Sequence, residues 1–164
     1  MPDRLTIEER SRNMAAVKGK DTKPEMVVRR FLWAHGFRYR VNDKRLPGRP
    51  DVVLGRLKVC IFVNGCFWHG HQGCRFFVMP KTNRVFWQQK IARNRRRDRE
   101  VNERLIVDGW RVITLWECQL KPSTRKATLE NLVDLLNTYA IETHPHRGYE
   151  LDNGYSLVAE DDLF

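Results

Sequence analysis

The sequence predicts an α/β fold, a sheet flanked by helices, from the order of its apolar runs. DVVL at 51–54 and VCIFV at 59–63 are rich in β-branched residues and are predicted to be buried strands of one sheet. RVITLW at 111–116 predicts a further buried strand. Helical patterns precede, separate and follow these runs, an order typical of α/β domains. With 164 residues, of which 41% are hydrophobic, the chain suits one domain with its own core.

Capping signals place the first two helices. TIEE at 6–9 has the spacing of a capping box and predicts a helix that runs to about Val17. TKPE at 22–25 repeats the signal with a proline inside the first turn, and Gly36 is expected to end this second helix.

The remaining elements follow from turn residues and periodicity. FRYRV at 37–41 predicts a short strand, and LPGRP at 46–50 has the composition of a turn. Residues 83–108 are predicted to form a long, very basic helix closed by Gly109, and 126–139 a closing amphipathic helix.

Charge is unevenly distributed along the chain. Lysines and arginines number 30 against 20 acidic residues, a net charge of +10. Residues 141–164 contain six acidic side chains against Arg147 alone, so the surplus lies in 1–140. We therefore expect one domain over 1–140, with a helical arm at 1–20, and an acidic tail that is loosely attached or disordered. Such a surplus attracts a polyanion such as DNA, RNA or an anionic membrane, although a solvated basic surface is the ordinary alternative.

The cysteines indicate a metal site. The sequence contains no apolar run long enough to span a bilayer, and its polar start lacks a signal peptide's apolar stretch, so we expect a cytoplasmic protein. Its four cysteines are then better candidates for metal binding than for disulfides. Cys60 lies inside a predicted strand and is expected in the core.

The stretch NGCFWHGHQGC at 64–74 carries most of the metal-type ligands. Cys66, His71 and Cys74 have the spacing C-x4-H-x2-C, and Cys118 follows the strand at 111–116. Three cysteines and one histidine form a standard closed structural zinc site, with no open position for chemistry. His69 is an alternative ligand to His71, and unrelated buried cysteines are the ordinary explanation.

Asp51 is the candidate magnesium ligand. It follows GRP at the start of a buried strand, although such an aspartate is more often an ordinary turn residue. The next strand ends in VNG at 63–65 and lacks the Glu-x-Lys of many nucleases, so a backbone carbonyl, substrate phosphate and water would complete the site. His69 is the candidate for proton transfer near neutral pH. Glu25 or Asp98 could orient it.

Together these pieces resemble the very-short-patch repair (Vsr-type) mismatch endonucleases. The matching stretches are RSRNM (10–14), DTKPE (21–25), LPGRPD (46–51), VNGCFWHGH (63–71), PKTN (80–83), FWQQKI (86–91), RD (97–98), GWRV (109–112) and WEC (116–118). The resemblance implies a restriction-endonuclease-like, PD-(D/E)XK-type fold with a central mixed sheet and a structural zinc site. It also implies magnesium-dependent nicking of double-stranded DNA on the 5′ side of the mispaired T in a T:G mismatch. Such mismatches arise by deamination of 5-methylcytosine, and family members usually accompany a cytosine-5 methyltransferase.

The resemblance assigns roles residue by residue. The zinc ligands become Cys66, His71, Cys74 and Cys118. The magnesium ligands become the Asp51 carboxylate and the Val63 carbonyl, and His69 is the catalytic histidine supported by Glu25 and Asp98. The chain departs from well-known members at Asn64, where they have a second histidine. Asn64 can hydrogen-bond a phosphate or a metal-bound water, but it cannot transfer a proton.

The resemblance also explains the aromatic residues of the 64–74 stretch. Phe67, Trp68 and Trp87 resemble the family's wedge, which inserts into the base stack beside the mismatch, although Trp87 could simply pack its helix. The expected DNA contacts are Arg12, Met14, Lys90, Arg93, Arg95 and Arg96, where the basic side chains would hold phosphates. The first helix, which carries Arg12 and Met14, could instead pack against the sheet.

Three other functions fit the sequence less well. One is a non-catalytic zinc module that recognises distorted DNA. Another is a related nicking endonuclease for a different mismatch or a damaged base, and the third is an RNA-binding protein. Mismatch-repair proteins are candidate partners, no membrane association is expected, and a monomer is predicted because no dimer seam is evident.

Overall fold

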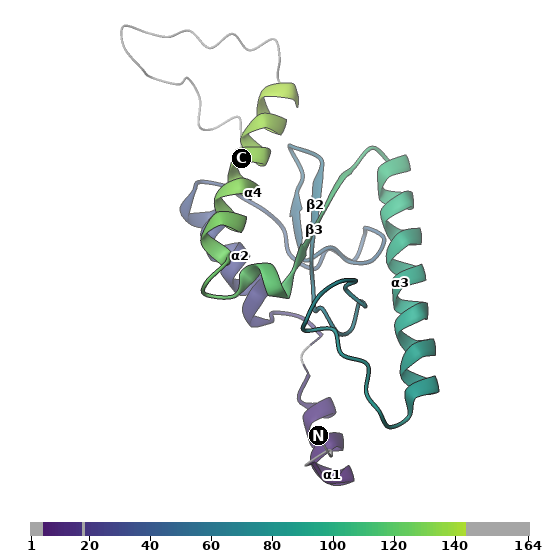
Figure 1. The fold of residues 1–164 in the computed structure, drawn as a ribbon. Coiled ribbons are helices and arrows are strands. Elements are labelled where there is room, and N and C mark those ends of the chain that lie inside the picture. The colour runs from purple at the N-terminus through teal and green to yellow at the C-terminus, as the bar shows by residue number, and fades with distance from the viewer. Residues whose placement is uncertain (1–4, 18, 144–164) are drawn as a thin grey trace, which may run out of the picture.

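The structure is a computed structural model that describes residues 5–17 and 19–143. Its elements are α1 (Ile7–Ala15), α2 (Lys23–Ala34), β1 (Val52–Leu54), β2 (Val59–Asn64), α3 (Arg84–Val107), β3 (Arg111–Trp116), the 3-10 turn η1 (Glu117–Leu120) and α4 (Arg125–Thr143). Figure 1 shows α2 and α4 on one face of the sheet and α3 on the other. The α/β prediction is therefore confirmed: a small sheet forms the middle layer between two layers of helices.

The sheet has three strands in the order β1-β2-β3 and is mixed. β1 pairs antiparallel with β2, with Val52 opposite Ile61. β2 pairs parallel with β3, which places Asn64 beside Trp116. Because β2 and β3 end at the same edge, the residues that follow them are brought together there. Asp51, immediately before β1, reaches the same edge because β1 runs the opposite way.

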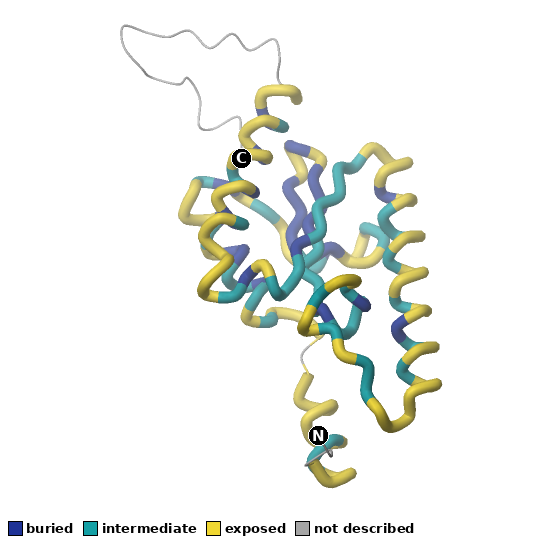
Figure 2. The backbone as a smooth tube through the Cα atoms, in the orientation of Figure 1, coloured by how far each residue is buried: buried dark blue, intermediate teal, exposed yellow. Residues whose placement is uncertain are grey.

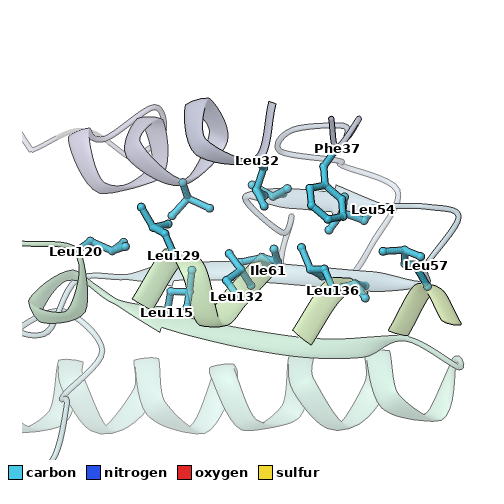
Figure 3. Packing of buried hydrophobic residues seen from close by; sticks show 14 residues of the cluster. Leu32, Phe37, Leu54, Leu57, Ile61, Leu115, Leu120, Leu129, Leu132 and Leu136 are labelled. Atoms are coloured by element: carbon cyan, nitrogen blue, oxygen red, sulfur yellow. The ribbon is translucent and has the colours of Figure 1, made fainter. Parts of the chain in front are cut away.

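Period-two alternation divides the strand side chains between two cores. Val52, Leu54, Val59 and Ile61 join the larger core with the leucines of α2 and α4 (Figure 3). Val53 and Cys60 face α3 and pack with Leu105. Figure 2 shows β1 and the first half of β2 as buried and β3 as mostly intermediate, whereas α1 contains no buried residue.

The capping predictions are confirmed, with one shift. At α1, Thr6 accepts a hydrogen bond from the backbone of Glu9, and the Glu9 carboxylate accepts one in return from Thr6. At α2, Thr22 caps Glu25 as expected. The Glu25 carboxylate, however, accepts from the backbone N–H of Asp21 and not from that of Thr22. The start of α2 is therefore not an ordinary capping box, because the Glu25 carboxylate bonds one residue before the N-cap.

Two predicted elements differ from the structure. FRYRV does not form a strand, because only Arg40 makes a bridge, to Val53 of β1, and the chain then turns away. The last helix continues to Thr143, so the first residues of the expected tail are helical, and Glu142 pairs with Arg111 at 2.8 Å. The rest of that tail, 144–164, lies outside the described residues. Within the described part of the chain, no helix has the length and apolar character needed to cross a membrane.

Candidate active site and metal centre

The candidate catalytic residues line one cleft of about 1200 Å³ at the edge where β2 and β3 end. Its walls include Glu25 at the start of α2, Asp51 before β1, and Val63 and Asn64 of β2. His69 and Asp98 complete the set from the 64–74 stretch and from α3. Four separate segments therefore meet around a single space, and every residue expected to take part in catalysis borders it.

Asp51 is held at the base of this cleft by the neighbouring strand. Its Oδ2 accepts a hydrogen bond of 2.7 Å from the backbone N–H of Val63. Burial above all, together with the charge of Glu25, raises the pKa of the Asp51 carboxyl from 3.8 to about 6. The Val63 hydrogen bond and the charges of Arg29 and His69 oppose that rise. A desolvated carboxylate of this kind favours a divalent cation as its partner.

His69 pairs with Asp98 and not with Glu25. The distance from His69 Nδ1 to Asp98 Oδ2 is 2.6 Å. An ionised carboxylate only accepts, so Nδ1 carries the proton of a neutral ring and Nε2 keeps its lone pair. Glu25 instead bonds Arg29 and the backbone of Asp21. Of the two predicted orienting groups, the structure therefore places Asp98 on the histidine.

The four predicted zinc ligands converge. The ligand atoms of Cys66, His71, Cys74 and Cys118 all lie within 4.8 Å of one another. His71 belongs to the cluster, whereas His69 does not. Three thiolates and one imidazole at this spacing fit a tetrahedral zinc ion, with bonds of about 2.3 Å to sulfur and about 2.0 Å to nitrogen. Cys60 stays in the core as predicted, and burial raises the pKa of its thiol to about 12.

Several contacts fasten the 64–74 stretch between the sheet and α3. Gly70 has φ of +60°, and a Cβ built there would meet Ile91 at 2.7 Å and Arg95 at 2.8 Å. Asn94 donates a hydrogen bond of 2.8 Å to the Trp68 carbonyl. A glycine is therefore required at position 70 for the loop to approach the helix this closely.

The His71 imidazole contacts Cys118 on one side, with 3.5 Å between Nδ1 and Sγ, and it also packs against an aromatic ring. It stacks on Trp116 at the end of β3, with ring centroids 4.0 Å apart and the planes 3° from parallel. Such stacking fixes the plane of the imidazole and thus the direction of its ligand atom.

The predicted wedge residues form one aromatic cluster. Phe67 lies 5.2 Å from Trp68 and 5.3 Å from Trp87, measured between ring centroids, and the contacts are edge-to-face. All three rings are half-buried, so each packs on the others while keeping an exposed side. Lys90 lies 5.6 Å above the Trp68 ring. Phe86, half-exposed and 5.2 Å from Trp87, extends the cluster.

The predicted DNA contacts outside the aromatic cluster lie on two elements. Arg93, Arg95 and Arg96 are exposed on α3. Arg12 and Met14 are exposed on α1, which shows no buried side chain to pack against the sheet. This arrangement fits an arm that contacts a ligand better than a helix that packs.

Four residues at the site were not anticipated. Arg29, Asn94, Trp116 and Phe86 each touch a predicted site residue or its neighbour. The FW pair that opens α3 could have indicated Phe86. The other three could not be found from the sequence, because each acts across elements whose relative placement it does not show.

The family model and the similar proteins all point to DNA mismatch and nicking endonucleases. The profile described as "DNA mismatch endonuclease Vsr" matches residues 2–75. The DNA mismatch endonuclease Vsr of Escherichia coli is 42% identical over 130 residues, covering 79% of this chain and 82% of that protein. The type II nicking enzyme V.XorIIP of Xanthomonas oryzae is 43% identical over 135 residues, covering 82% and 98%. The type II nicking enzyme V.NmeAIP of Neisseria meningitidis is 47% identical over 121 residues, covering 74% and 86%.

Proposed function

The chain belongs to the DNA mismatch endonuclease Vsr family, and we propose that it nicks double-stranded DNA beside a T:G mismatch. In this proposal the cut lies on the 5′ side of the mispaired T, requires magnesium and serves the repair of deaminated 5-methylcytosine. One observation carries the chemistry: Asp51 and the His69–Asp98 pair border the same cleft. The PD-(D/E)XK-type fold belongs to the proposal too, and the mixed sheet with Asp51 at its edge supports it.

Asp51 would hold the magnesium ion together with the Val63 carbonyl. A single protein carboxylate suits magnesium, which retains several waters and takes further ligands from substrate phosphate. Bound there, the ion would polarise a phosphoryl oxygen and stabilise the leaving oxygen. Asn64 lies beside this point and offers an amide that can hydrogen-bond a phosphate or a water.

His69 would act as the general base. The Asp98 carboxylate fixes the Nδ1 proton, so Nε2 is the atom that can accept a proton from an attacking water. Asp98 would also pair with the imidazolium that results, because its Oδ2 lies 2.6 Å from Nδ1. With Asn64 in place of a second histidine, a single imidazole does this work.

The aromatic cluster and the basic face would bind the mismatched duplex. Phe67, Trp68 and Trp87 present apolar edges, and unstacking a base step costs a few kcal/mol, less at a mismatch than at a paired step. Stacking of a base on an aromatic ring returns about 1–3 kcal/mol. Zinc held by the three cysteines and His71 would keep these rings and His69 in register, since all four side chains lie within or against the 64–74 loop.

The test is a nicking assay on labelled duplexes. T:G, other mismatches and fully paired DNA are compared with magnesium or EDTA, for wild type, Asp51→Ala and the control Asp108→Ala at the exposed end of α3. A nick 5′ of the mispaired T that needs magnesium and Asp51, but not Asp108, is the expected result. Tight T:G binding without cleavage would instead favour a recognition module, and cleavage of another mismatch would favour a different target.

The proposal also includes the oligomeric state, the cellular location and the partners of the protein. The protein acts as a monomer in the cytoplasm, and mismatch-repair proteins are its candidate partners. Competition by RNA against a mismatched duplex distinguishes the RNA-binding alternative, because a Vsr-like site requires double-stranded DNA and would be little affected.

A further inference from the structure

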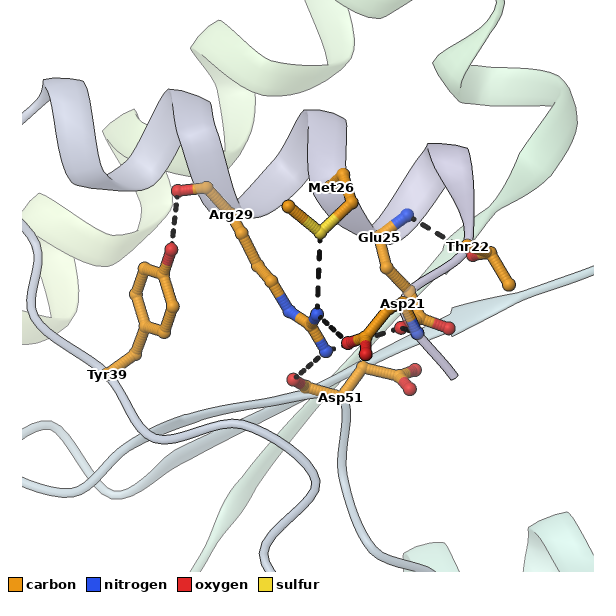
Figure 4. Close-up of polar contacts among 7 residues, drawn as sticks. All are labelled: Asp21, Thr22, Glu25, Met26, Arg29, Tyr39 and Asp51. Atoms are coloured by element: carbon orange, nitrogen blue, oxygen red, sulfur yellow. Dashed lines mark hydrogen bonds and ion pairs between the residues drawn. The ribbon is translucent and has the colours of Figure 1, made fainter. Parts of the chain in front are cut away.

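We propose that Arg29 is a positioning residue that holds Glu25 and Asp51 in their working arrangement. The inference rests on the proposed function, since it assigns a role within that cleft. Arg29 lies in the middle of α2 and is only 5% exposed, and Glu25, one turn earlier, is 4% exposed. Figure 4 shows its guanidinium between the start of α2 and the backbone of Asp51.

The guanidinium joins three segments of the chain. Nη2 donates to Glu25 Oε2 at 3.3 Å and to the backbone carbonyl of Asp51 at 3.2 Å. Nη1 donates to the Asp21 carboxylate at 2.6 Å. Tyr39 in turn donates to the Arg29 carbonyl at 2.8 Å. Only a forked, permanently charged group can make these contacts at once, because lysine has a single nitrogen.

The contacts fix one oxygen of Glu25 and leave the other available. Oε2 accepts both from Arg29 and from the backbone N–H of Asp21, at 2.8 Å. Within the described residues, Oε1 has no hydrogen-bond partner, and Glu25 borders the cleft. Arg29 thus orients the carboxylate so that Oε1 can accept a hydrogen bond from a water in the cleft. It also offsets the repulsion between two neighbouring carboxylates.

A purely structural role fits these observations less well. Desolvation offsets much of the attraction in a buried ion pair, so such pairs are weak stability devices. Arg29 Nε is also buried without a hydrogen-bond partner among the described residues, which is a further cost. The buried guanidinium of Arg29 has an energetic cost and bonds directly to the Asp51 backbone. Its role in positioning Glu25 and Asp51 explains its presence better than stability does.

The experiment is a double-mutant cycle of Arg29→Lys with Glu25→Gln. Single-turnover nicking of a T:G duplex is measured at saturating enzyme and magnesium, with the duplex Kd and the Tm in EDTA as separate readouts. Arg30→Lys, at the exposed next position of α2, is the matched control. Arg29→Lys should slow nicking about 10-fold to 100-fold, as misplaced groups do, with Kd unchanged within about twofold.

Coupling decides whether Arg29 acts through Glu25. The double variant should lose clearly less than the product of the two single losses, because the part of the Arg29 effect that acts through Glu25 is already lost in Glu25→Gln. Asp21→Asn gives an independent check if Arg29→Lys folds poorly, because it loosens the guanidinium from an exposed position, and it should slow nicking several-fold with Tm little changed.

The outcomes separate the two proposals. Additive losses in the double variant, a wild-type rate in Arg29→Lys, or a Kd that weakens in parallel with the rate would overturn the inference alone. A wild-type protein that cleaves no mismatched duplex would overturn the proposed function, and this inference with it.

Discussion

Asp51→Asn should stabilise the protein at pH 8 while abolishing cleavage. Burial, followed by the charge of Glu25, raises the pKa of Asp51 from 3.8 to about 6 in the folded protein. In the unfolded chain the carboxyl ionises near 3.8, so between about pH 4 and pH 6 only the unfolded state gives up its proton. The free energy of unfolding therefore falls as pH rises through this window, and above it the loss is complete.

The size of this effect follows from the two pKa values. A difference of about two units corresponds to at most about 3 kcal/mol at 1.4 kcal/mol per unit. Asparagine carries no charge to desolvate, and its amide oxygen can still accept the Val63 N–H bond. The variant should then be about 1–3 kcal/mol more stable than wild type at pH 8, or roughly 4–10 °C in Tm for a domain of this size.

Thermal unfolding in EDTA at pH 8 and at pH 4 provides the measurement. The stability gap between Asp51→Asn and wild type should shrink to less than about 1 kcal/mol at pH 4, where the folded carboxyl is protonated and the unfolded one is only partly ionised. Asp43→Asn is a control of opposite sign, because hydrogen bonds from Arg45 hold the pKa of the Asp43 carboxyl well below its usual range. A variant that is less stable than wild type by the same amount at both pH values would refute the reasoning.

Three further predictions concern the loop and the aromatic cluster. We expect elemental analysis of the wild-type protein to find one zinc per chain. Cys118→Ser should lose this zinc and lower Tm, whereas Cys60→Ser should keep it. Full zinc retention in Cys118→Ser would show that the proposed ligand set is wrong. Trp87→Ala should weaken binding of a T:G duplex by about 5-fold to 150-fold in a fluorescence titration, from the loss of about 1–3 kcal/mol of stacking. An equal loss on fully paired DNA would argue against a wedge. Gly70→Ala should lower Tm by several degrees, because its Cβ would meet Ile91 at 2.7 Å and its φ is +60°; an unchanged Tm would show that the loop can move away from α3.

Local signals in the sequence were enough to predict most of the elements. The capping box at Thr6, the β-branched runs around Cys60 and the basic run of α3 each depend on near neighbours in the chain. FRYRV failed because its β propensity had no partner strand: only Arg40 reaches β1. Propensity describes what a segment can form, and the sheet edge decides whether a partner is present.

The candidate site also has parts that local sequence signals predict and parts that depend on contacts between distant segments. The cysteine and histidine cluster was predictable because three of its residues lie within nine positions, Cys66 to Cys74, and cysteine and histidine have few roles other than metal binding at that spacing. The sequence could not decide whether Glu25 or Asp98 is the partner of His69. That choice depends on how α2 and α3 are placed relative to the sheet. Arg29 was missed for the same reason: in sequence it is one more basic residue of an amphipathic helix.

The arrangement of the cleft joins its chemistry to its stability. Asp51 is held where its charge is poorly solvated, and the pKa of about 6 records a cost that the fold bears in the absence of a cation. The charge of Arg29 limits this cost from the α2 side, while its hydrogen bond goes to the Asp51 carbonyl and not to the Asp51 carboxylate. The carboxylate thus stays available to a divalent ion, while its backbone is fixed. A group that neutralised the Asp51 carboxylate directly would stabilise the protein and would occupy the position proposed for the metal ion.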